Sequence, residues 1–248
     1  MLELTELRDR RDAVMERIAG AAARAGRDAA EITLVAVTKT WPAELVIAAH
    51  AIGLRHFGEN RPEELAVKRP IVETALGVDN GITWHLIGPV QSRKSDLAAA
   101  HADVFHALDR SKIAHRLSND LVRFGRTLPS FIEVNVSGEA TKHGFNLVNW
   151  ENDATQRNSL RTMIRKTAEL PGLPVMGLMT MAPWDAERDL IRSVFHRTRG
   201  IADWLLAEGD VSHALYLSMG MTDDFEIAIE EGATHVRVGR ALFGEREK

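Results

Sequence analysis

Eight short apolar runs, each followed by a turn and most by a longer amphipathic or alanine-rich stretch, constrain the fold of this chain more than any other feature. The predicted strands are residues 32–38, 55–57, 83–87, 104–108, 130–136, 175–181, 214–218 and 234–238. The predicted helices include residues 43–52, 92–101, 111–124, 160–170, 186–206 and 223–231. Strict alternation of strand and helix implies parallel strands with helical crossovers, in either a closed barrel or an open sheet.

The positions of the polar residues favour the barrel. Lys39, Asn60 and Gln91 follow the first three runs, and Ser218 and Gly239 end the last two. In a barrel, functional groups gather at the carboxyl ends of many strands, whereas an open sheet concentrates them at one switch point. We therefore predict an α/β fold, a single (β/α)8 TIM barrel.

The length of 248 residues suits one barrel, and no linker divides the sequence. We expect residues 1–248 to form a single domain without a C-terminal β-domain. Residues 1–26 predict an extra amphipathic helix that covers one end of the barrel, and residues 149–158 predict a polar surface insertion.

Composition excludes several classes of function. A net charge of −4 gives no broad basic field for nucleic acid or an anionic membrane, and no apolar run reaches the length of a membrane span. The absence of cysteine excludes zinc–thiolate sites and cysteine nucleophiles, and the histidines lack ligand spacing, so no metal is expected. The charged N-terminal segment lacks the apolar core of a signal peptide, which predicts a cytoplasmic protein.

Lys39 directly continues the apolar run ITLVAVT, which places its amine at the predicted barrel mouth. Burial favours the neutral amine, the form that attacks an aldehyde, so Lys39 is a candidate Schiff-base former. A rim lysine with its ammonium in water is an equally good interpretation of this position alone.

Two segments near the C-terminus have the pattern of anion sites. In LSMGMTDD, residues 217–224, a strand runs into a helix start, where amides and the hydroxyls of Ser218 and Thr222 can cradle a phosphate. Ordinary helix capping explains the same pattern. In VRVGRALFG, residues 236–244, Gly239 ends a strand and permits close backbone approach. Barrels commonly bind phosphate in the loops after strands seven and eight, and strand eight lies beside strand one when the sheet closes. A ligand with an aldehyde at one end and a phosphate at the other therefore fits between Lys39 and these two segments.

Other patterns are weaker. His85 lies within an apolar run and is interpreted as a core or site-lining residue rather than a base. Glu59 and Glu133 could form the pair of catalytic carboxylates of a barrel glycosidase. The single tyrosine and the few other aromatic residues, however, provide few side chains on which a sugar ring could stack.

Six motifs in order resemble the pyridoxal phosphate homeostasis protein family, whose members are similar to the alanine racemase N-terminal domain. They are LVAVTKT (34–40), HFGEN (56–60), WHLIGPVQSRK (84–94), GLMTM (177–181), LSMGMTDD (217–224) and VRVGRALFG (236–244). The resemblance implies a fold-type III barrel with pyridoxal 5′-phosphate linked to Lys39.

The resemblance also implies a set of cofactor contacts. Phosphate contacts would come from Ser218 and Thr222, from amides near Met219 and Gly220, and from the backbone at Gly239 and Arg240. Arg237 would face the pyridine nitrogen. Asn60, His85 and Met179 would line the pocket. No residue is assigned a catalytic role.

Two positions depart from the family pattern: Arg93 replaces an expected asparagine, and Thr222 replaces a serine but keeps the hydroxyl.

The family implies buffering and delivery of pyridoxal phosphate, with apo pyridoxal phosphate-dependent enzymes as partners of a monomer or weak homodimer. The alternative is an amino-acid racemase or related weak enzyme. Racemisation by two bases needs a second base opposite the lysine, and the only tyrosine, Tyr216, lies within a predicted strand.

Overall fold

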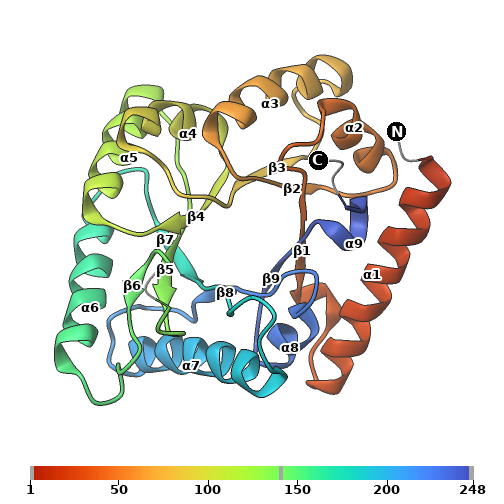
Figure 1. Cartoon of the computed structure of the whole chain (residues 1–248). Coiled ribbons are helices and arrows are strands. Elements are labelled where there is room, and N and C mark those ends of the chain that lie inside the picture. Colours follow the sequence, from red (N-terminus) through yellow and green to blue (C-terminus); the bar gives the residue numbers. More distant parts are fainter. Residues whose placement is uncertain (1–2, 140–141, 246–248) are drawn as a thin grey trace.

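A closed barrel of eight parallel strands forms the centre of the computed structural model, which describes residues 3–139 and 142–245. The barrel strands are β1 (Thr33–Val37), β2 (His56–Glu59), β3 (Thr83–Leu86), β4 (Val104–Leu108), β5 (Ser130–Asn135), β7 (Val175–Met179), β8 (Tyr216–Ser218) and β9 (His235–Val238). The pairing of β1 with β9 and of β4 with β5 closes the sheet, as Figure 1 shows. The predicted TIM barrel is confirmed, with each of the eight predicted runs supplying one strand.

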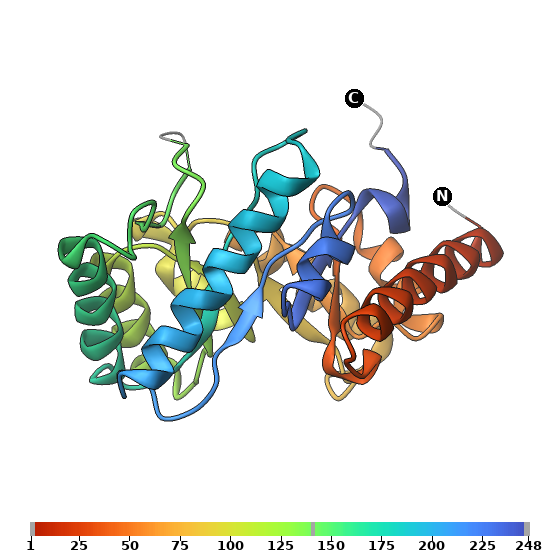
Figure 2. The same cartoon turned by 90° about the horizontal axis from the view of Figure 1, so that it is seen from below.

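Helices surround the strands, and most of them bury an apolar stripe against the barrel or a neighbouring helix. They are α1 (Leu4–Arg24), α2 (Ala43–Ala51), α3 (Pro62–Leu76), α4 (Ser95–His101), α5 (Ser111–Phe124), α6 (Ala154–Ala168), α7 (Arg188–Ala207), α8 (Phe225–Glu230) and α9 (Arg240–Phe243), with 3-10 turns at Ala29–Glu31 and Ser92–Lys94. The view in Figure 2 shows this ring of helices from the side.

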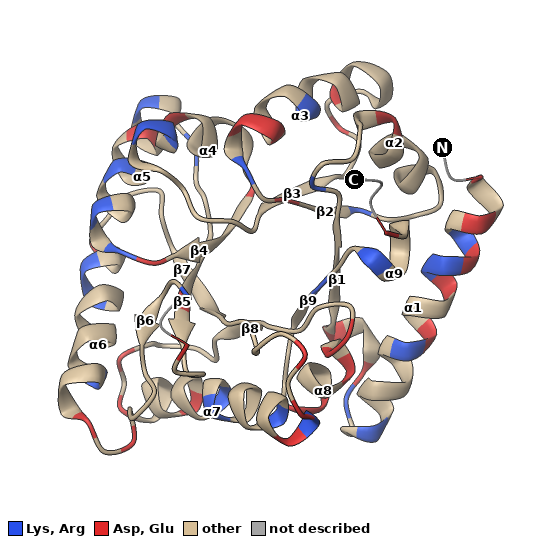
Figure 3. Ribbon diagram, in the orientation of Figure 1, with Lys and Arg blue, Asp and Glu red and all other residues tan. Residues whose placement is uncertain are grey.

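The extra N-terminal helix is present, but it does not lie across a barrel end. Leu7, Val14 and Ile18 form the buried face of α1, which packs against α8 and α9 on the outside of the barrel (Figure 1). Basic and acidic residues alternate along its exposed face in Figure 3. An amphipathic pattern predicts an apolar partner but does not specify which surface that partner presents.

Two other segments differ from the sequence prediction. The predicted insertion at 149–158 is partly helical, because α6 begins at Ala154, where the Asp153 side chain accepts hydrogen bonds from the amides of Thr155 and Gln156. A short strand, β6 (Phe145–Asn146), pairs with β5. The first six residues of α6 contain no apolar side chain larger than alanine, so hydrophobic periodicity did not reveal this end of the helix.

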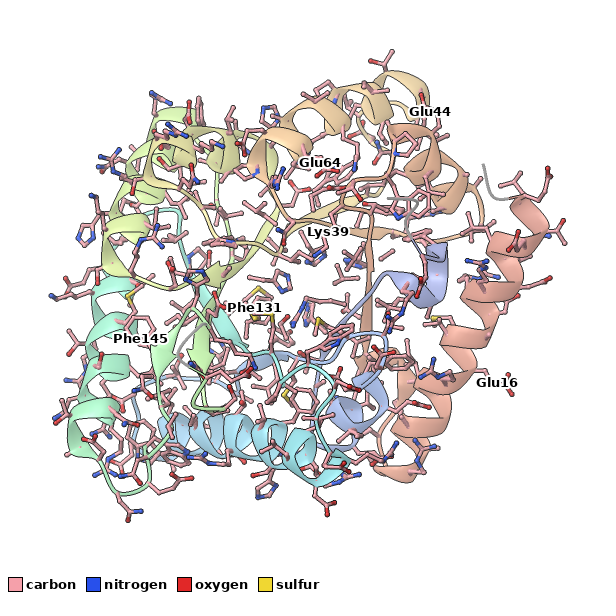
Figure 4. The ribbon with its side chains drawn as sticks, in the orientation of Figure 1. Glu16, Lys39, Glu44, Glu64, Phe131 and Phe145 are labelled. Carbon is pink, nitrogen blue, oxygen red and sulfur yellow. The ribbon has the colours of Figure 1, made fainter. Side chains whose placement is uncertain are left out.

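The interior of the barrel holds rings rather than aliphatic side chains alone. His85, His106, Phe131 and His235 come from four different strands and contact one another, with ring centroids between 4.5 and 6.2 Å apart. Figure 4 labels Phe131 within the ring of strands. These residues form the floor beneath the carboxyl ends of the strands.

Candidate functional site

A cleft of about 580 Å³ opens at the carboxyl ends of the barrel strands. Its lining includes six residues singled out from the sequence: Lys39, Asn60, Thr222, Arg237, Gly239 and Arg240. They come from the ends of β1, β2, β8 and β9 or the turns that follow. The barrel therefore gathers into one cavity residues from opposite ends of the sequence.

Lys39 lies on the turn that leaves β1, and its side chain is half-buried (Figure 4). The residue after it, Thr40, adopts a left-handed conformation with φ of 69°. This conformation is uncommon for a residue other than glycine, so the surroundings must hold it. The amide of Thr40 donates to Glu64 Oε1, and the hydroxyl of Thr38 donates to Glu59 Oε1 at 2.7 Å. Both neighbours of Lys39 are thus tied to carboxylates of β2 and α3.

The turn after β8 exposes backbone amides to the cleft. Gly220 has φ of 96°, and a Cβ there would lie 2.6 Å from the Cβ of Ala228, so the turn requires glycine. Asp224 Oδ1 accepts from the Met221 amide at 2.5 Å, which fixes the turn. Among the residues that the structure describes, the amides of Thr222 and Asp223 have no hydrogen-bond acceptor. Such amides can receive an anion.

Gly239 brings a second backbone segment to the same cleft. A Cβ on Gly239 would lie 3.3 Å from the carbonyl oxygen of Val37, so the chain passes close to β1 at this point. Within the described ranges, the amides of Gly239 and Arg240 also lack an acceptor. The Arg240 guanidinium forms an ion pair with Asp223, an acid on the cleft rim. The negative charge of Asp223 is thereby paired.

Arg237 places a buried positive charge beneath the cleft. Its side chain is 5% exposed and donates to Ser218 Oγ at 2.6 Å and to the carbonyl of Thr180 at 3.0 Å. Burial lowers the pKa of Arg237 to about 10, an effect opposed by the carboxylates of Asp224 and Glu133. The side chain stays a cation at neutral pH.

Five other residues singled out from the sequence lie outside the cleft lining. Met179, Met219 and Gly220 are buried behind it, and His85 and Ser218 are buried in the barrel interior. The hydroxyl of Ser218 is within 2.7 Å of His106 Nδ1 as well as of Arg237. A strand pattern predicts which residues end a strand, but it does not say whether an end residue points into the barrel or into the mouth.

Several cleft residues were missed by sequence reasoning. Trp41 and Trp184 both line the cleft, and Trp184 is 73% exposed with the Arg240 guanidinium 5.6 Å from its ring centroid. Asp185, in the loop after β7, and Arg188, the first residue of α7, continue the wall. The loop after β7 carries no periodic hydrophobic pattern, so no signal in the sequence indicated that its residues line the cleft.

Neither a metal site nor a membrane segment is found in the described residues. Residues 3–139 and 142–245 contain no cluster of three or more His, Asp or Glu side chains that could hold a metal ion. None of the helices in these ranges has the length and hydropathy to cross a membrane.

Comparison with known proteins identifies the family. The family model described as the alanine racemase N-terminal domain matches residues 10–247. A pyridoxal phosphate homeostasis protein from Pseudomonas aeruginosa is 42% identical over 94% of this chain and 93% of its own length. A protein of the same name from Escherichia coli is 39% identical over 94% of each chain.

Solved structures agree with this assignment. PipY of Synechococcus elongatus PCC7942, solved with PLP bound, is 31% identical and has a TM-score of 0.75, covering 93% of this chain and 100% of PipY. An alanine racemase from Clostridium difficile shares the fold at 13% identity, with a TM-score of 0.72 over 98% of this chain and 58% of the racemase. On these grounds the chain belongs to the pyridoxal phosphate homeostasis protein family, within the alanine racemase N-terminal domain proteins.

Proposed function

We propose that the protein binds pyridoxal 5′-phosphate in the cleft, holds it as a Schiff base on Lys39, and buffers and delivers it to apo-enzymes. Relatives at 39% and 42% identity are named for pyridoxal phosphate homeostasis, and PipY was solved with PLP bound. The aldehyde of the ligand requires an amine, and its phosphate requires backbone amides that no other group occupies. In this chain both lie around one cavity.

The relation between Lys39 and the turn after β9 carries the proposal. β1 and β9 are neighbours, with Val35 opposite Arg237 and Ala36 opposite Val238. Lys39 and the Gly239 backbone therefore leave adjacent strands at nearly the same height. Thr222 lines the same cleft from the turn after β8, the strand on the other side of β9 from β1. A ligand with an aldehyde at one end and a phosphate at the other can span this arrangement.

Each group has a defined task in this proposal. The Lys39 amine would condense with the aldehyde carbon, with release of water, and the amides at Thr222, Asp223, Gly239 and Arg240 would hold the phosphate with the Thr222 hydroxyl. Arg237 would face the ring nitrogen, where a permanent cation would keep that nitrogen unprotonated. When bound, the cofactor supplies an electron sink, and an unprotonated ring nitrogen weakens it.

The position of the only tyrosine favours a carrier over a two-base racemase. Tyr216 is the first residue of β8, at the end of the strand away from the cleft, and packs against His235. It does not line the cleft. The proposal includes a cytoplasmic location and a monomer or weak homodimer. Sedimentation velocity over a range of concentrations tests the oligomeric state.

Reduction of the loaded protein tests the Schiff base. Protein incubated with pyridoxal phosphate is expected to absorb in the visible range, and borohydride followed by peptide mass analysis should find the cofactor on Lys39. Lys39→Ala should abolish both signals. Lys166→Ala, which changes an exposed lysine of α6, is the matched control and should keep them. A wild-type protein that takes up no cofactor would overturn the proposal.

A transfer experiment tests delivery. Loaded protein is mixed with an apo pyridoxal phosphate-dependent enzyme in the presence of a trap that consumes free cofactor. Reactivation that survives the trap supports delivery, and reactivation lost to the trap argues for buffering alone. Rapid exchange of the α-proton of D- or L-alanine in deuterated water would instead favour the racemase.

A further inference from the structure

An unbroken row of hydrogen bonds crosses the barrel interior below the cleft. Nδ1 of His56 lies 3.0 Å from Nε2 of His85, and Nδ1 of His85 lies 2.8 Å from Nε2 of His106. Nδ1 of His106 lies 2.7 Å from Oγ of Ser218, to which Arg237 donates at 2.6 Å. The row links the half-buried His56 at the start of β2 with the arginine under the cleft.

The arginine at one end sets the direction of every bond in this row. A guanidinium can only donate, so it occupies one lone pair of Ser218 Oγ. His106 is the one other partner of this hydroxyl among the described residues. Because Ser218 is buried and a buried hydroxyl proton without an acceptor is costly, the Ser218 proton points at His106 Nδ1. A neutral His106 then carries its proton on Nε2 and donates to His85 Nδ1. Because His85 Nδ1 accepts this bond, a neutral His85 carries its proton on Nε2 and donates to His56 Nδ1.

The surroundings keep the two inner rings neutral. Burial lowers the pKa of His85 and His106 well below the ordinary value, and the nearby His56, His235 and Arg237 lower one or both further. Burial likewise lowers the pKa of His235, to about 4. A neutral imidazole has one donor and one acceptor, as the row requires.

Arg237 needs such support because it has no direct counter-ion. It forms no salt bridge with any carboxylate in the described part of the chain. Glu133 and Asp224 act on it only from a greater distance. In the row, each ring turns its unprotonated, electron-rich nitrogen toward the arginine. Aligned dipoles of this kind stabilise a buried cation without neutralising it.

We propose that His85 and His106 are positioning residues for Arg237: both stay neutral with the proton on Nε2, and they orient Ser218 so that the arginine presents an unneutralised charge to the cleft. The tautomers are a property of the ligand-free protein, and only the effect on pyridoxal phosphate rests on the proposed function.

Nitrogen NMR of the imidazoles tests the tautomers directly. In ligand-free wild-type protein at neutral pH, His85 and His106 are expected to show a protonated Nε2 and a bare Nδ1. Arg237→Met removes the obligatory donor and should introduce the Nδ1-protonated form at His106. A wild-type His106 or His85 that is charged, or protonated on Nδ1, would overturn the assignment.

Cofactor binding tests the positioning role. His106→Phe keeps a flat ring against Phe131 but removes the acceptor for Ser218, and we expect roughly tenfold weaker pyridoxal phosphate binding. His106→Asn, which restores an acceptor near the position of Nδ1, should recover most of the loss. His235→Phe is the matched control, because His235 is a buried interior histidine whose own hydrogen bond goes to Thr234. It should bind normally.

Three outcomes separate the two proposals. Correct tautomers in a protein that binds no pyridoxal phosphate would leave the histidine assignment standing and remove the proposed function. Normal binding by His106→Phe would remove the positioning role alone. Equal losses in His106→Phe and His235→Phe would show that general packing of the interior, rather than the hydrogen bond to Ser218, governs binding, and this result would also overturn the positioning role.

Discussion

Lys68 Nζ lies 2.6 Å from Oε1 of Glu59, and both side chains are buried beneath the turn that carries Lys39. The same ammonium donates to the carbonyl of Thr38 at 2.9 Å and to Glu64 at 3.0 Å. Oε2 of Glu59 has no partner among the described atoms. Burial raises the pKa of Glu59 to about 7 even though Lys68 lowers it. This buried pair joins β2 and α3 to the residue that precedes the proposed Schiff-base lysine.

Removing Lys68 should destabilise the protein in a pH-dependent manner. Lys68→Met leaves the Glu59 carboxylate buried without a cation, and we expect the free energy of unfolding to fall by roughly 3 kcal/mol at about pH 8. The loss should be smaller near pH 5.5, where the carboxyl is protonated and carries no charge. Urea unfolding at both pH values measures this difference. Lys166→Met is the exposed control, and an equal loss at both pH values would contradict the account.

Glu133 should make the protein less stable as pH rises. It is 3% exposed, and burial together with Asp109 raises its pKa from 4.5 to about 7, with Arg237 opposing the shift. Between these values the folded state binds more protons than the unfolded state, so this residue's contribution to stability falls as pH increases through the window. Glu133→Gln should therefore match wild type near pH 4.5 and exceed its stability by roughly 2 kcal/mol at about pH 8. A variant equally or less stable at the higher pH would show that Glu133 ionises at little cost.

Gly220 should tolerate no side chain, whereas Gly209 should tolerate one at modest cost. Both have positive φ, 96° and 72°, so alanine strains both by about 1 kcal/mol. At Gly220 the new Cβ would also lie 2.6 Å from Ala228 and 2.8 Å from the Cα of Phe225, while at Gly209 nothing lies within 4 Å. Thermal unfolding should show a much larger loss for Gly220→Ala, together with lost pyridoxal phosphate binding. Similar losses in the two variants would mean that the turn relaxes.

The barrel could be predicted from the sequence because its determinants are local. Each strand is a short apolar run and most helices have an apolar stripe. The hydrophobic periodicity of the segments and their order along the chain were therefore enough to predict the topology. Asn60 and Gly239 could be placed at the mouth for the same reason, since they follow strands directly. The beginning of α6 was missed because no large apolar residue precedes Leu160, so that only the Asp153 cap marks this end of the helix.

The interior could not be predicted, because the direction of a side chain at a strand end depends on tertiary packing. His85 and Ser218 were expected among the cofactor contacts, yet hydrogen bonds to His106 hold both inside the barrel. His106 itself lies in the middle of an apolar strand and carries no local signal. The Glu59–Lys68 pair joins residues nine positions apart on a strand and a helix, so it becomes visible only once α3 is placed.

The ion pair between Asp223 and Arg240 should tune anion binding at the cleft. Asp223→Asn removes a negative charge beside the Thr222 amide, so pyridoxal phosphate should bind roughly threefold tighter to this variant. Arg240→Gln leaves Asp223 unpaired, so it should weaken pyridoxal phosphate binding by a similar factor. The double variant should bind nearly as wild type does, since the neutral amide introduced by Asp223→Asn needs no cationic partner. Equilibrium dialysis at low and high salt measures these effects, which should shrink at high salt because both side chains reach solvent. Arg165→Gln, which breaks an ion pair between Arg165 of α6 and Asp210, neither of which lines the cleft, should change nothing. An Arg240→Gln protein that binds as tightly as wild type would mean that Asp223 already points away from the bound anion.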